Sequence, residues 1–179
     1  MSIRGQKKSP ARTIALVGLM AATVECGKLA LALIPNVEVV TVLLALYGYV
    51  FGASGVMAAV IFVCIEPLIY GFGTWVITYF IHWPLVAVAF MLFSKLRIKN
   101  RWILTALAVV LTAWFGILSS LVDVGLFSGT YEKFWYRFGI YYARGITFYL
   151  TQIICNAVLF PLLFTYLAGK LEKIKKQFE

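Results

Sequence analysis

Residues 102–122 read WILTALAVVLTAWFGILSSLV, a run of 21 positions without a charged side chain. A helix rises about 1.5 Å per residue, so about 20 apolar residues cross the hydrocarbon core of a bilayer, which is about 30 Å thick. The run begins just after Lys99 and Arg101 and ends before Asp123. Its length and its charged borders predict a transmembrane helix.

The rest of the chain has the same character. Hydrophobic residues make up 63% of the 179 positions and charged residues 13%, whereas a soluble domain has about 45–50% and about 25%. A soluble core cannot absorb this much apolar surface. The composition therefore predicts an integral membrane protein whose length is nearly used up by its spans.

Apolar windows predict an all-α, polytopic bundle of six transmembrane helices that forms a single substrate-binding domain over residues 1–179. The second and third windows are short and meet at Phe51-Gly52-Ala53-Ser54-Gly55, where glycine permits a tight reversal. One long broken helix is the alternative, and it leaves five spans. The predicted helices lie near 13–34, 37–51, 53–70, 74–96, 102–122 and 145–169, with a loop at 123–144.

The positions of Lys and Arg predict the orientation. Twelve of the 16 basic residues fall before residue 13, between 95 and 101, or after 169, and with six spans these segments share one side. Lys and Arg in short loops are retained in the cytoplasm. We therefore expect both termini to be cytoplasmic, the aromatic-rich 123–144 loop to be external, and the chain to lie in a bacterial plasma membrane.

Several function classes are disfavoured. The net charge of +9 is confined to the ends and one loop, which argues against nucleic-acid binding. The sequence holds one histidine, His82, and no Gly-x-Ser-x-Gly, His-Glu-x-x-His or Walker A motif. Its three cysteines occur singly, without metal-ligand spacing. We expect no catalytic residues, no metal and no cofactor in this chain.

Polar side chains gather near the predicted external ends of the helices. Charges at membrane depth cost about 2.5–3.5 kcal/mol each unless they are paired or hydrated. This one-sided distribution predicts an outward-facing pocket with aromatic walls, closed beneath by apolar side chains. The groups concerned are Glu25 and Lys28, one turn apart and able to pair, Glu66, Trp75, Tyr79, His82, Gln152 and Asn156.

Small residues follow one face of the first predicted helix. Ala11, Ala15, Gly18 and Ala22 are spaced by three or four positions. Such spacing lets another helix approach closely. It predicts a face that docks a membrane partner.

Together these features resemble the S component, the substrate-binding subunit of energy-coupling factor (ECF) vitamin transporters, over the whole chain. The resemblance rests on Arg12-Thr13-Ile14-Ala15-Leu16, the loop Ile34-Pro35-Asn36-Val37-Glu38 and the Phe51-Gly52 turn. The chain is most similar to the cobalamin-specific type. S components for folate, riboflavin, pyridoxine or pantothenate, and a membrane enzyme with the same cavity, are alternatives.

The resemblance implies a subunit that captures a vitamin outside and delivers it by toppling in the bilayer, driven by a T protein and two ATPases that alone use ATP. The small-residue face would dock the T protein. The implied substrate-binding residues are Asn36, Glu38, Tyr70, Trp75, Tyr79, His82, Tyr131, Trp135, Tyr136, Tyr141 and Arg144.

Overall fold

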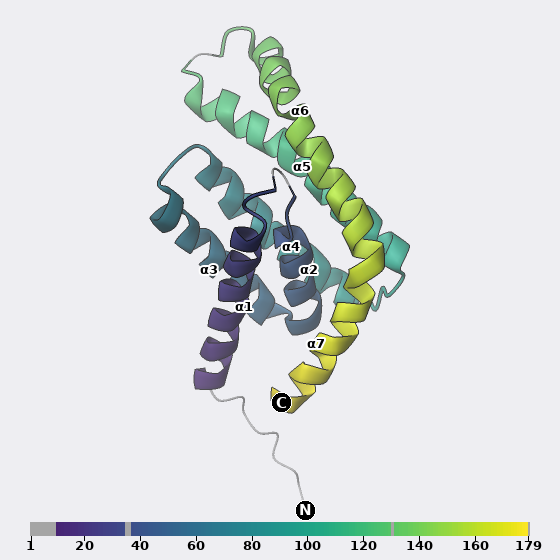
Figure 1. The fold of residues 1–179 in the computed structure, drawn as a ribbon. Helices are drawn as coiled ribbons and strands as arrows, with labels where there is room; N and C mark the ends of the chain where they lie inside the picture. Colours follow the sequence, from purple (N-terminus) through teal and green to yellow (C-terminus); the bar gives the residue numbers. More distant parts are fainter. Residues whose placement is uncertain (1–9, 35–36, 130, 179) are drawn as a thin grey trace, which may run out of the picture.

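The computed structural model describes residues 10–34, 37–129 and 131–178, and these residues form helices and short connections without a strand (Figure 1). The predicted all-α class is confirmed. The elements are α1 (Pro10–Ala30), α2 (Val40–Phe51), α3 (Ala53–Tyr70), α4 (Trp75–Lys95), α5 (Arg101–Phe127), α6 (Phe134–Leu159), a π-helical turn (Phe160–Phe164) and α7 (Thr165–Phe178).

Five helical segments of the described chain are long and apolar enough to cross a membrane. They are α1, α3, α4, α5 and the continuous rod of α6, the π-helical turn and α7. Pro161 lies inside that turn, where its missing N–H favours a local widening of the helix. The sixth helix, α2, has 12 residues and is therefore only about 18 Å long. The chain is a helical membrane protein with one short helix.

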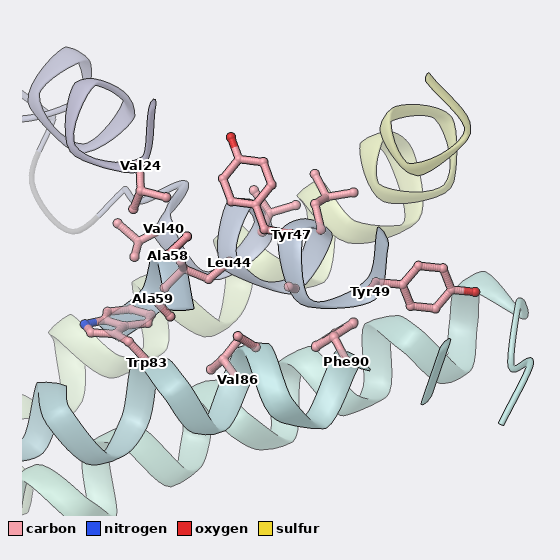
Figure 2. Close-up of a cluster of buried hydrophobic side chains, with 14 of the residues drawn as sticks. Val24, Val40, Leu44, Tyr47, Tyr49, Ala58, Ala59, Trp83, Val86 and Phe90 are labelled. Atoms are coloured by element: carbon pink, nitrogen blue, oxygen red, sulfur yellow. The ribbon is translucent and has the colours of Figure 1, made fainter. Parts of the chain in front are cut away.

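The short helix α2 is the centre of the bundle. It contacts α1, α3, α4, α5, α6 and α7, and all of its residues except Leu43 and Phe51 are buried. Figure 2 shows Val24 of α1 pointing toward α2 from one side and Val86 and Phe90 of α4 pointing toward it from the other. Neighbouring helices, not lipid, therefore surround α2.

Glycines bring the central backbones into direct contact. A Cβ atom on Gly48 of α2 would lie 2.1 Å from the carbonyl oxygen of Ala87 in α4, and one on Gly55 of α3 would lie 2.2 Å from that of Tyr47. Between α2 and α3, Gly52 has φ +61°, a conformation that favours glycine. The predicted reversal between two separate helices is confirmed.

The carboxyl end of α2 gathers two of the basic segments. The Tyr49 hydroxyl donates to the carbonyl of Ile98 at 2.9 Å, and Lys175 Nζ donates to the carbonyl of Val50 at 2.9 Å. Figure 1 shows the start of α1 and the whole of α7 at this same end of the bundle. Which side of the membrane this end faces stays a prediction.

The predicted loop over 123–144 is wrong. The chain leaves the helical conformation only between Phe127, where α5 ends, and Phe134, where α6 begins. Aromatic rings at helical spacing stabilise the extra turns of α6, since Phe138 and Tyr142 stack with centroids 6.0 Å apart and Tyr142 lies 5.5 Å from Tyr149. The polar content of this segment lowers its hydropathy without interrupting the helix. Two smaller differences are that α1 ends at Ala30 and that α2 begins at Val40.

Candidate functional site

Two neighbouring cavities lie where α1 ends, α2 begins and α3 turns into α4. Each has a volume of about 250 Å³, and both are lined by Lys28, Tyr70 and Tyr79. The first cavity is also lined by Leu31, Ala32, Ile34, Val37, Glu38, Val40, Phe62, Trp83, Phe148 and Gln152. The second is also lined by Glu66 and Trp75.

A group of charged side chains lies beside the second cavity. Lys28 of α1 forms an ion pair with Glu66 of α3, and its Nζ lies 3.9 Å from the centroid of the Tyr70 ring. The Tyr70 hydroxyl donates to Oε1 of Glu25 at 3.0 Å. The predicted pairing of Glu25 with Lys28 within one helix is therefore replaced by bonds between α1 and α3. These bonds hold the two helices together at the cavity.

Two carboxylate oxygens in this group have no hydrogen-bond partner among the described residues. They are Oε2 of Glu25 and Oε1 of Glu66, whose side chains belong to residues only 9% and 1% exposed. A buried anion without a partner is costly. These oxygens are the strongest unused acceptors at the site.

Glu38, by contrast, is held from several sides. Its carboxylate accepts from the backbone N–H of Thr41 at 2.8 Å, from the Thr41 hydroxyl at 2.5 Å and from Nδ2 of Asn156 at 2.9 Å. Asn156 also donates to the Thr112 hydroxyl at 3.0 Å. The carboxylate therefore lies at the amino end of α2, where the helix dipole favours negative charge, and it links α2 to α5 and α6.

An aromatic ladder on α4 forms one wall. Trp75 and Tyr79 have ring centroids 5.0 Å apart, and Tyr79 and Trp83 follow at 5.5 Å, both edge to face. Positions four apart share a helix face. Of the residues predicted to bind substrate, Glu38 lines the first cavity, Trp75 the second, and Tyr70 and Tyr79 both. Their role in binding stays a prediction.

His82, which was predicted to bind substrate, lies behind this wall. Its ring is buried behind the ladder, with centroids 4.8 Å from Trp83 and 4.9 Å from Phe115, and it lines neither cavity. Although His82 follows Tyr79 by three positions, the side chain packs toward α5. It is part of the support behind the wall.

The predicted binding residues between 131 and 144 lie apart from the two cavities. Figure 1 shows the upper parts of α5 and α6 extending beyond α1 to α4. Asn36 lies outside the described residues. Five of the residues predicted to bind substrate are exposed and line neither cavity: Tyr131, Trp135, Tyr136, Tyr141 and Arg144.

The cavities end on an apolar floor. Phe62 of α3 and Val40 of α2 line the first cavity, and below them α2, α4 and the π-helical turn form a continuous buried cluster. In that cluster Phe160 and Phe164 stack with centroids 5.2 Å apart, and Phe90 lies 5.3 Å from Phe164. A packed apolar core therefore separates the site from the opposite end of the bundle.

The small residues of α1 lie away from the site. Ala11, Ala15, Gly18 and Ala22 are all exposed, and no atom lies within 4 Å of a Cβ placed on Gly18. In the described chain this face of α1 is free to receive another helix.

No protein-family model, curated protein or solved structure matches this chain. Among the described residues, no group of three or more His, Cys, Asp or Glu side chains could hold a metal ion. Sequence reasoning placed Lys28 and Glu66 near the same pocket but did not predict their ion pair, because the residues belong to different helices. The sequence signal for this site was Glu66, a glutamate directly before Pro67 in an apolar segment.

Proposed function

We propose that this chain is the substrate-capture subunit, or S component, of an ECF-type vitamin importer in a bacterial plasma membrane. The observation that carries the proposal is a polar, aromatic-walled cavity inside an otherwise apolar bundle of helices. Binding pockets are concave, mostly apolar, and equipped with a few placed polar groups. The cavities between α1, α2, α3 and α4 have this composition.

The closed floor supports capture over conduction. A channel needs a polar path through both leaflets, whereas the bundle below the cavities is filled by Phe90, Phe160 and Phe164. A ligand that enters at the open end therefore cannot pass through the bundle unless the subunit itself moves. Toppling of the subunit, driven by a T protein and two ATPases, is the movement that we propose.

The cavity volume bears on the substrate. Pockets for drug-sized ligands measure about 300–1,000 Å³, and each cavity here measures about 250 Å³. A small ring compound fits within a space of this size, whereas a corrin is much larger. The resemblance favours cobalamin as the substrate. On the basis of the cavity volume we propose a vitamin smaller than cobalamin.

The exposed face of α1 supports a partner. Ala11, Ala15, Gly18 and Ala22 form a strip of small side chains, and helices in lipid associate through such strips because close packing replaces the absent hydrophobic driving force. We propose that the T protein docks here, at a distance from the cavities.

Transport with the ATPase module tests the proposal. Vesicles containing this chain, a T protein and two ATPases should accumulate vitamin only with ATP, and catalytically inactive ATPases should abolish uptake. Uptake that persists with inactive ATPases would contradict the proposal. A membrane enzyme, the rival function, would instead convert its ligand without any nucleotide.

A further inference from the structure

We infer that the cavity between α1, α3 and α4 binds a ligand through a compact organic cation, such as an ammonium group. This inference names the chemical class of the ligand and rests on the proposed function for its biological use. It is carried by the charges, the unpartnered oxygens and the aromatic rings around the cavity.

The charges around the two cavities do not balance. Glu38 lines the first cavity and Glu66 the second, and Glu25 reaches them through Tyr70. All three glutamates interact electrostatically with Tyr79. Lys28 is the one Lys or Arg of the described residues among the lining side chains of these cavities. Two glutamates thus line the cavities and a third lies behind Tyr70, whereas Lys28 is the one ammonium group among the lining residues.

The unpartnered oxygens show where a positive charge is needed. Glu66 lines the cavity, and its Oε1 is buried without a partner in the described chain. Glu25 and Glu66 also interact with each other. Neighbouring carboxyl groups disfavour each other's charge unless one of them holds a proton or cations lie beside them, and Lys28 pairs with one oxygen of Glu66 only. A ligand ammonium would add a second positive charge and donate hydrogen bonds to the free oxygens.

The aromatic rings provide the rest of a cation site. Tyr70, Trp75 and Tyr79 line the same cavity, and the faces of such rings attract cations within about 6 Å of the centroid. Lys28 already makes this contact with Tyr70, at 3.9 Å. The site therefore combines carboxylate and ring contacts for a positive charge, and it repels an anion.

Three ring compounds of similar size and different charge test the inference on the full-length purified protein. They are benzylammonium, benzyl alcohol and benzoate, each titrated to millimolar concentration by calorimetry. We expect benzylammonium to bind at least about tenfold more tightly than benzyl alcohol, a difference of about 1.4 kcal/mol, and benzoate not to bind. Equal binding of benzyl alcohol, tighter binding of benzoate, or no binding of any of the three would overturn the inference.

A substitution locates the effect. E66Q should reduce benzylammonium affinity about tenfold or more, while E172Q, which removes the same charge from α7 at the opposite end, should leave it unchanged. Equal affinity of E66Q and the native protein would overturn the inference. Should E66Q fail to fold, the three-compound series on the native chain still decides.

The outcomes also separate the ligand class from the transport role. ATP-driven uptake of a neutral or anionic vitamin would overturn the cation and leave the transport proposal standing. Binding of benzylammonium without any ATP-dependent uptake would support the cation site and contradict the transport proposal.

Discussion

The two ends of this bundle are built from different interactions. At the crossing of α2 with α3 and α4, backbones touch through Gly48 and Gly55, and stacked phenylalanines fill the remaining space. At the other end, Lys28 forms an ion pair with Glu66, and Tyr70 donates a hydrogen bond to Glu25, beside open volume. Within lipid the first arrangement stabilises because of close packing, whereas charges such as those of the second are costly unless they are paired or hydrated. Stability and ligand chemistry should therefore respond to different substitutions.

The largest effect is expected at the closed end from Gly48→Leu. The new side chain would meet the Ala87 carbonyl, and a backbone atom cannot move aside as a side chain can. Overpacking costs about 1–3 kcal/mol even where side chains yield, so we expect loss of folded protein, measured as loss of the monodisperse peak in size-exclusion chromatography. Gly18→Leu adds the same side chain where no neighbour lies within 4 Å and should remain folded.

The next effect is expected from Phe90→Ala. The ring contacts Phe160 and Phe164, and its removal leaves a cavity in the packed floor. Such truncations cost about 3–5 kcal/mol in soluble cores, so the apparent Tm in detergent should fall steeply. Trp102→Ala, which removes a ring that is 62% exposed, should change the Tm little; a similar fall in both variants would contradict the role of the stacked rings.

A smaller effect is expected from Asn156→Ala. This change removes the donor that links Glu38 to Thr112, which leaves a buried acceptor one hydrogen bond short at a cost of about 1–3 kcal/mol. A lower Tm and weaker ligand binding should appear together, because Glu38 also lines the first cavity. In Thr151→Ala, which loses only a bond to the Thr147 carbonyl of its own helix, both should stay near the native values.

The smallest effect is expected from Tyr70→Phe at the open end. The variant loses the hydrogen bond to Glu25 but keeps the ring below Lys28, so it should lose about 0.5–1.5 kcal/mol of stability. The test compares the Tm of this variant with the Tm of Tyr166→Phe. Tyr166 lies at the other end, and its side chain is 62% exposed. A fall as large as that of Phe90→Ala would show that the open end also carries the stability.

Much of the helical architecture follows from hydropathy, because apolar length alone identifies α1, α3, α4 and α5. The amino-terminal half of α6 does not, since its Tyr and Arg residues lower the hydropathy while its rings still stack at helical spacing. Sequence reasoning therefore replaced a helix with a loop over 123–144. It could not show that α5 and α6 extend beyond the bundle.

The candidate site was predictable residue by residue only where its members share a helix. Trp75 and Tyr79 are four positions apart, so their common wall follows from periodicity. Lys28 and Glu66 are separated by 38 positions, and only the crossing of α1 with α3 brings them together. For His82, helical spacing suggests the same wall as Tyr79. The spacing does not reveal that the His82 side chain turns toward α5.

The 12 residues of α2 have one more consequence. A helix about 18 Å long is about 12 Å too short to span a 30 Å hydrocarbon layer. The longer helices around α2 separate the remaining space from the lipid acyl chains. The first cavity lies on the amino end of this helix, at Glu38 and Val40. A guest molecule there would lie among the helices, so it would have to shed water to enter and would be partly shielded from the aqueous phase once inside.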